Sequence, residues 1–162
     1  MGIALVVAVV GAACGPRIAA APPPAPAPPT CVGPAGPPDT ISSELFTLTN
    51  NDRAANGLGP LRWNPQLWCL AHGWSAHIAG MGTLTHRDLN AVIRSPEYRG
   101  YYALGENLLR GSRSLTAGAM ENAWMNSSGH RANIVGGQFT SFAVAYFITG
   151  DGQIFVTANF GG

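Results

Sequence analysis

Hydrophobic residues recur every three to four positions in two segments, which is the spacing of a helix that buries one face. The first set consists of Ile41, Leu45, Leu48 and Ala55. It predicts a helix from about Ser42 to Asn56, with capping oxygens from Asp39 and Thr40 at its start. The second set consists of Leu67, Ala71, Trp74 and Ile78. It predicts a helix that is capped by Asn64, has Pro65 in its first turn and ends within residues 80–82.

The second half of the chain changes from helical spacing to strands. Helical patterns cover Asp88–Arg94 and Ser114 to about Asn126, and residues 101–109 form an apolar strand that Gly105 interrupts. Residues 142–148 are apolar on both faces, which is typical of a strand that is covered on both sides. A turn over 149–153 leads into an antiparallel strand over 154–160. Helices followed by a covered hairpin predict a three-layer α-β-α sandwich.

The N-terminal segment carries the pattern of an export signal. The apolar run over residues 3–10 is too short to span a bilayer but matches the hydrophobic core of a secretory signal, so residues 1–20 are predicted to be a signal peptide or a lipoprotein signal. Small residues directly before Cys14 resemble a lipoprotein cleavage site, which would leave the protein lipid-anchored at Cys14. The alternative is ordinary cleavage near residues 19–21. Both alternatives predict a secreted or cell-envelope protein.

Ten of the thirteen prolines lie between Pro16 and Pro38. Such a stretch prefers extended polyproline conformations, so residues 21–38 are predicted to be a Pro/Ala-rich linker and residues 39–162 the folded domain. If lipid occupies Cys14, Cys31 and Cys69 remain as a pair, and an oxidising compartment favours a disulfide between them. The alternative is a buried free thiol at Cys69.

The charge composition argues against one class of partner. The chain of 162 residues has a formal net charge of +1, and all nine of its basic residues are arginines. Binding to nucleic acid relies on a basic excess that contacts phosphates, and this chain has none. The only membrane association that the sequence predicts is the possible anchor at Cys14.

The candidate chemistry rests on two histidines and a glutamate. His86 and His130 lie in polar segments that are predicted to be loops, whereas Glu106 interrupts an apolar strand. A carboxylate buried in a strand needs a partner, and an imidazole or a metal ion would supply one. Two His and one Glu suit zinc with an open fourth position, so His86, Glu106 and His130 are the predicted metal ligands. The alternative is a solvated or capping role for each. The other two histidines, His72 and His77, are expected to be packed or capped.

Several short motifs together resemble the CAP superfamily, which groups cysteine-rich secretory proteins, insect antigen 5 and plant pathogenesis-related proteins. In chain order they are Asn50-x-x-Arg53-x-x-x-Gly57-Leu58-x-Pro60-Leu61-x-Trp63, His86, Gly105-Glu106-Asn107, Trp124, Gly129-His130-Arg131-x-Asn133 and Thr157-x-x-Phe160-Gly161. The chain is most similar in pattern to the bacterial secreted, SCP-like branch. The resemblance implies an α+β fold, a three-layer α-β-α sandwich of the CAP type with a mostly antiparallel central sheet.

The resemblance also implies a cleft lined by two His and two Glu. His86, Glu106 and His130 match three of the four positions, but Ser127 stands where the family has its second Glu. Loss of a carboxylate should weaken the affinity for a divalent metal.

Three functions remain open at this point. The first is a secreted or envelope-anchored binding module for an apolar or sterol-like ligand, a metal or a cell-surface molecule. The second is a metal-assisted hydrolase in the same cleft, and the third is a purely structural His/Glu cluster in a surface interaction protein.

Overall fold

The computed structural model describes residues 31–162, which form one compact unit. The predicted signal over residues 1–20, the anchor at Cys14 and the part of the linker before Cys31 lie outside the described residues. The elements in chain order are α1 (Thr40–Ala55), β1 (Arg62–Trp63), α2 (Pro65–Met81), α3 (Leu89–Arg94), β2 (Leu104–Ser112), α4 (Ala117–Met125), α5 (Ser128–Ile134), β3 (Ser141–Ile148) and β4 (Gln153–Gly161). No helix in residues 31–162 is long and apolar enough to cross a membrane.

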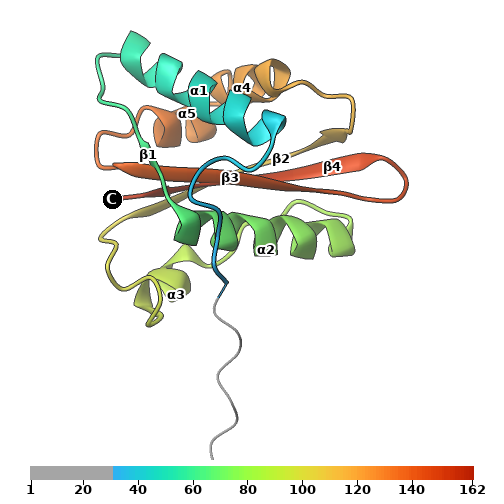
Figure 1. The fold of residues 1–162 in the computed structure, drawn as a ribbon, viewed down its shortest axis with the longest axis horizontal. Helices are drawn as coiled ribbons and strands as arrows, with labels where there is room; N and C mark the ends of the chain where they lie inside the picture. Colours follow the sequence, from blue (N-terminus) through green and yellow to red (C-terminus); the bar gives the residue numbers. More distant parts are fainter. Residues whose placement is uncertain (1–30) are drawn as a thin grey trace, which may run out of the picture. The chain divides into compact units, whose positions relative to one another are not determined.

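The elements form three layers, as the sequence predicts. The sheet has the strand order β1-β3-β4-β2, with α1, α4 and α5 on one face and α2 and α3 on the other (Figure 1). The pairs β2–β4 and β3–β4 are antiparallel, whereas the two-residue strand β1 pairs in parallel with the start of β3. The sheet is therefore mixed, and β1 is a strand that the sequence pattern did not predict.

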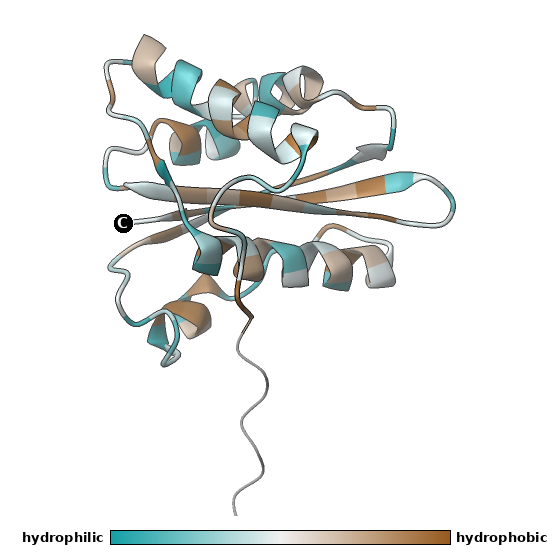
Figure 2. Cartoon of the chain, in the orientation of Figure 1, coloured by the Kyte–Doolittle hydropathy of each residue, from teal (hydrophilic) through white to brown (hydrophobic). Residues whose placement is uncertain are grey.

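The core lies on both faces of the β3–β4 hairpin. Hydrophobic stretches follow the central strands, while polar residues recur along the outer helices (Figure 2). The largest cluster joins the sheet to α1 and α4 through buried side chains that include Leu45, Trp124, Phe142 and Phe160. Smaller clusters join the sheet to α2 through Leu67, Leu70 and Ile78. Burial of apolar surface on both sheet faces is what stabilises a three-layer arrangement.

The predicted caps of the first helices are confirmed. The Asp39 carboxylate accepts from the Ser42 N–H, and the Asn64 side chain accepts from the N–H groups of Gln66 and Leu67. Helix α2 ends at Gly82, whose φ of 67° lies in the left-handed region that favours glycine. The C-terminal hairpin is also confirmed.

Three predicted details are wrong. Helix α4 begins at a Thr116 cap, not at Ser114, and residues 128–134 form helix α5 where a loop was expected. On α1 the predicted Leu45 is buried and Ile41 and Leu48 pack against the same core cluster, whereas Ala55 is exposed. The polar residues Ser42, Thr49 and Arg53 are also buried. Thr49 and Arg53 have polar partners more than 70 positions away, which periodicity alone does not reveal.

The predicted disulfide between Cys31 and Cys69 is present. It ties the residues before α1 to helix α2. The Trp63 indole N–H also donates to the Pro34 carbonyl at 3.0 Å, so residues 31–38, which the sequence assigned to the linker, pack against the domain.

Candidate functional site

Glu106 lies at the edge of the sheet and faces helix α2. On β2, Glu106 pairs with Asn159 of β4, and two residues later Leu108 pairs with Thr157. The Ser75 hydroxyl of α2 donates to the Thr157 hydroxyl, which identifies the face of the sheet on which these residues lie. Because side chains alternate along a strand, Glu106 points to the same face as Leu108. The residue is only 4% exposed, so its carboxylate depends on protein partners.

Both oxygens of the Glu106 carboxylate are engaged by the loop that follows α2. His86 Nδ1 donates to Oε1 at 3.0 Å, and the Arg87 backbone N–H donates to the same oxygen at 3.3 Å. The Arg87 guanidinium donates from Nε to Oε2 at 2.8 Å. A carboxylate accepts only, so this contact assigns a proton to Nδ1 of His86, and in the neutral imidazole Nε2 is then the acceptor.

Arg87 is the residue that the sequence analysis missed. Its Nη2 donates to the Leu70 carbonyl at 2.7 Å, and its guanidinium lies 4.6 Å from the centroid of the Trp74 ring. Burial lowers the pKa of Arg87, and the Glu106 carboxylate opposes that shift by favouring the charged form. The sequence did contain a signal, because Arg87 directly follows a histidine that was already a candidate partner of Glu106.

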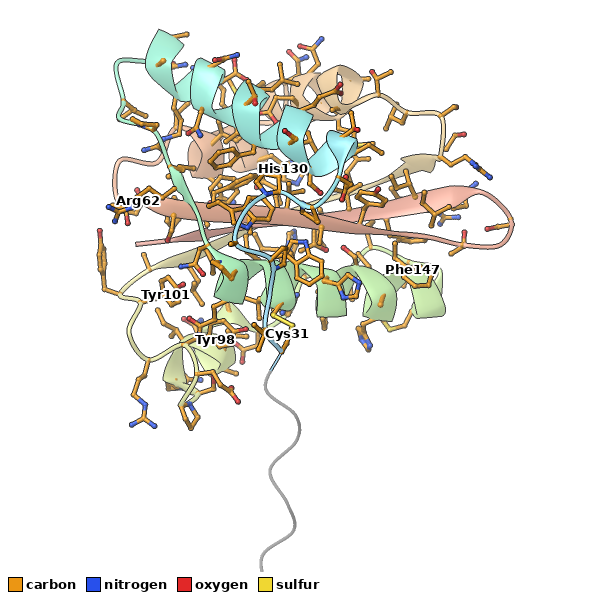
Figure 3. The ribbon with its side chains drawn as sticks, viewed as in Figure 1. Cys31, Arg62, Tyr98, Tyr101, His130 and Phe147 are labelled. Atoms are coloured by element: carbon orange, nitrogen blue, oxygen red, sulfur yellow. A yellow bond between two sulfur atoms is a disulfide. The ribbon has the colours of Figure 1, made fainter. Side chains whose placement is uncertain are left out.

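His130 approaches the same edge from the opposite layer. It lies on α5, and Figure 3 labels it above the sheet. Asn107, which follows Glu106 on β2, donates to the His130 carbonyl at 3.0 Å. Asn133 of α5 donates to the Asn107 side chain at 2.8 Å and to the Glu106 carbonyl at 3.2 Å. This amide network holds α5 against β2.

The pKa of His130 depends on its own burial and on the nearby His86. Burial lowers the pKa of His130, and the positive charge that His86 can acquire lowers it further. His130 is therefore biased toward its neutral form. The His86 side chain is 60% exposed, so at least one of the two imidazoles is open to solvent.

The position before Glu106 has no room for a side chain, which explains the glycine there. A Cβ atom at Gly105 would lie 2.9 Å from Asn133 Oδ1 and 2.9 Å from Phe139 Cζ. Such distances are too short for a side chain, so glycine permits the close approach of α5 to β2.

The predicted ligand set does not form a metal-binding group in this geometry. Within residues 31–162, no three His, Cys, Asp or Glu side chains come together in a way that could hold a metal ion. Glu106 and His86 are brought together, but they bond to each other and to Arg87. His130 contributes its backbone carbonyl to the network. Metal binding by His86, Glu106 and His130 stays a prediction, and the three side chains do not fit a three-ligand site as they are arranged.

Glu121 does not take the place of the missing family Glu. It is 3% exposed and lies on the other side of the sheet, where the Thr49 hydroxyl is 3.1 Å from each of its carboxyl oxygens. Burial raises the pKa of Glu121 to about 8; the contact with Thr49 lowers it, and Asp52 raises it further. This carboxyl is thus mostly protonated at neutral pH and belongs to the α1–α4 interface. Ser127, at the family position, is the N-cap residue of α5.

Comparison with known proteins gives consistent matches. A sequence model of the cysteine-rich secretory protein (CAP) family matches residues 46–160. The uncharacterized protein YkwD of Bacillus subtilis is 30% identical in an alignment of 127 residues that covers 70% of this chain and 46% of YkwD.

Solved structures show the same fold. An extracellular protein containing an SCP domain from Bacillus anthracis matches 74% of this chain and 39% of its own length, with a TM-score of 0.62 and 28% identity. An outer surface protein of Borrelia burgdorferi matches 72% of this chain and 88% of its own length, with a TM-score of 0.61 and 19% identity. This chain thus spans less than half the length of the two Bacillus proteins.

Proposed function

Because this chain belongs to the cysteine-rich secretory protein (CAP) family, we propose that it acts outside the cell or at the cell envelope as a binding module and not as a hydrolase. Its relatives include proteins described as extracellular and outer-surface. The disulfide between Cys31 and Cys69 agrees with an oxidising compartment. Fold alone does not confer catalysis, so the choice between binding and catalysis has to come from the site.

The observation that carries the proposal is the pairing of Glu106. A hydrolase in this cleft would need a carboxylate that is free to coordinate a metal or to accept a proton from water. Glu106 accepts from His86 at one oxygen and from Arg87 at the other, at 3.0 and 2.8 Å. With Ser127 at the second family position, no other carboxylate of the family pattern remains in the cleft.

Arg87 also opposes a divalent cation. Its guanidinium is an ion-pair partner of Glu106, and its side chain is 10% exposed. A second cation at Glu106 would have to displace it or lie beside a positive charge. The one remaining arrangement has both imidazoles as ligands, with Glu106 orienting His86 through Nδ1 as an outer-shell partner. One solved structure of similar fold, NaASP2, is described with Zn2+, at 12% identity and a TM-score of 0.58. That likeness supports only the fold of this chain.

Exposed apolar side chains that precede His86 in the chain support contact with a partly apolar ligand. Leu84, two residues before His86, is 43% exposed, and Met81 at the end of α2 is 45% exposed. Exposed apolar side chains beside a polar group that can form hydrogen bonds are the usual components of a ligand site. An apolar or sterol-like compound, or a molecule of the cell surface, is the proposed class of ligand.

A hydrolysis assay separates the binding module from the hydrolase. The full chain is incubated with zinc and with a panel of ester, peptide and phosphoester substrates, beside its His130→Ala variant and an Arg99→Gln control. We expect no turnover that depends on His130. Zinc-dependent turnover that His130→Ala abolishes and Arg99→Gln retains would contradict the proposal.

Anchoring at Cys14 is proposed as the means of attachment. Cell fractionation of the full chain and its Cys14→Ser variant tests it. We expect the wild-type protein in the membrane fraction and the variant in the soluble fraction. Equal release of both proteins would favour cleavage near residues 19–21.

A further inference from the structure

A concave site that contains neither His86 nor Glu106 lies beside the C-terminal end of α1. It is a cavity of about 450 Å³, where the end of α1, the loop before β1 and the loop before β3 meet. Its lining consists of Arg53, Leu58, Gly59, Pro60, Arg62, Gly137, Phe139 and Thr140. The volume falls within the range of cavities that hold small molecules.

The floor of this cavity contains a buried guanidinium. Arg53 is 3% exposed and donates from Nε to the Gly59 carbonyl at 2.9 Å. Its Nη1 donates to the carbonyls of Ile134 and Gly136, each at 2.9 Å, and its Nη2 donates to the Phe139 carbonyl at 3.2 Å. A guanidinium has five N–H donors, and these four bonds leave one on Nη2.

No carboxylate compensates the charge of Arg53 within residues 31–162, where both ion pairs involve Glu106. The neutral carbonyls accept hydrogen bonds from Arg53 but do not neutralise its positive charge. Burial accordingly lowers the pKa of Arg53. The position is unlike that of Arg87, whose charge is matched by a carboxylate.

The walls of the cavity suit an anion that carries an apolar group. Arg62 is exposed and lines the same cavity, and Figure 3 labels it beside β1. The lining includes two arginines and the Thr140 hydroxyl but no Asp or Glu. Leu58, Pro60 and Phe139 supply the apolar surface.

We propose that this cavity binds a small amphiphilic oxyanion, a carboxylate or phosphate attached to an apolar or aromatic group. Arg62 pairs with the oxyanion, and the apolar group packs on Leu58, Pro60 and Phe139. The two arginines fit the oxyanion, since arginine binds planar carboxylates and tetrahedral phosphates with several hydrogen bonds. The apolar lining fits the attached group. The buried Arg53 adds positive electrostatic potential to the cavity and forms part of its floor, and it also joins the loops. The proposal is independent of the function assigned to the His86 cleft.

The alternative is that Arg53 serves only to hold the loops together. That role explains its four hydrogen bonds, and it predicts no ligand. A test must therefore change the cavity without changing Arg53. Arg62→Gln removes the exposed charge. Gly137→Leu fills the cavity, since a Cβ atom at Gly137 meets only Leu58 Cδ2, at 4.0 Å.

The experiment is an NMR titration of the full, 15N-labelled chain with N-acetylphenylalanine and with phenyl phosphate. The neutral control ligand is N-acetylphenylalaninamide, and the matched control variant is Arg99→Gln, which changes an exposed arginine elsewhere. We expect saturable shifts at the amides of Gly59, Gly137 and Thr140 with at least one acid. Affinity should fall about tenfold in Arg62→Gln, be lost in Gly137→Leu and be unchanged in Arg99→Gln.

The relative affinity of the two acids identifies the source of the oxyanion. Tighter binding of N-acetylphenylalanine indicates a carboxylate ligand, and tighter binding of phenyl phosphate indicates a phosphate ligand. The proposal is overturned if neither acid shifts these amides, if the neutral amide binds as well as the acids, or if Arg62→Gln binds as tightly as the wild type.

Discussion

The two faces of the sheet bury ionisable groups in different ways. On the face of α2, Glu106 and Arg87 lie 2.8 Å apart and neutralise each other. On the face of α1 and α4, Arg53 and Glu121 are each 3% exposed, and neither has an oppositely charged partner in residues 31–162. Arg53 is satisfied by carbonyls, and Glu121 by a hydroxyl.

The presence or absence of an oppositely charged partner determines how each buried group responds to protons and ions. A compensated pair fixes geometry and has little reason to bind a further ion. A buried group without an opposite charge remains responsive, because a proton or a ligand relieves it. We therefore expect the Glu106 cleft to be insensitive to metals, and the α1 face to respond to pH and to anions.

The largest effect should come from Arg53. Arg53→Met removes four hydrogen bonds that join α1 to the loops at residues 59 and 134–139 and leaves buried carbonyls without donors. We expect a loss of about 5 kcal/mol in the free energy of unfolding, measured by urea denaturation. Arg62→Gln in the same region is the control and should change stability by less than about 0.5 kcal/mol. A small loss for Arg53→Met would mean that the carbonyls find water instead.

Glu121 should make stability depend on pH. The folded state holds a proton, because the pKa of Glu121 is raised from 4.5 to about 8, whereas the unfolded state releases it near pH 4.5. Its contribution is thus fully present below pH 4.5 and is lost as the pH rises through 8, by about 5 kcal/mol in total. Glu121→Gln should remove most of this slope, and Glu44→Gln, at an exposed site on α1, should retain it. Equal slopes in wild type and Glu121→Gln would show that Glu121 is ionised throughout.

Arg87 should have a smaller but specific effect. Arg87→Gln leaves Glu106 buried with His86 as its main partner and should cost about 3 kcal/mol. Adding Glu106→Gln should recover much of that loss, since it removes the uncompensated charge. Denaturation of the two single variants and the double variant measures the coupling. Additive losses in the double variant would contradict a direct pair.

His86 should have the smallest effect. His86→Ala leaves Arg87 on Glu106 and removes a side chain that is 60% exposed, so we expect a loss of about 1 kcal/mol. The loss should be the same with zinc and with a chelator. A larger loss in zinc than in chelator would indicate that the imidazole holds a metal.

The elements that the sequence predicted well have local signals. Asp39, Asn64 and Asp88 cap helices through side-chain bonds to N–H groups two or three residues away, and such caps are visible in one sequence. The C-terminal hairpin likewise follows from two apolar runs and a short turn. Family motifs then identified Glu106 and its neighbouring histidine as a site.

The features that were missed depend on distant partners. Helix α5 has seven residues, and Asn107, 23 positions earlier, holds it through the His130 carbonyl. Arg53 bonds to carbonyls more than 80 positions away, so hydrophobic periodicity, which placed Leu45 and Leu48 against the core, did not reveal that Arg53 is buried as well. Arg87 was missed because the unmet charge of Glu106 was assigned to an imidazole or a metal, not to the adjacent guanidinium.

A calorimetric titration of the full chain with zinc tests the central claim most directly. It is run on the wild type, His86→Ala and His130→Ala. The account predicts no stoichiometric binding to any of the three at millimolar zinc, because Glu106 is already paired with Arg87 and His86. One-to-one binding to the wild type that both substitutions abolish would contradict it and would establish a metal site in the cleft.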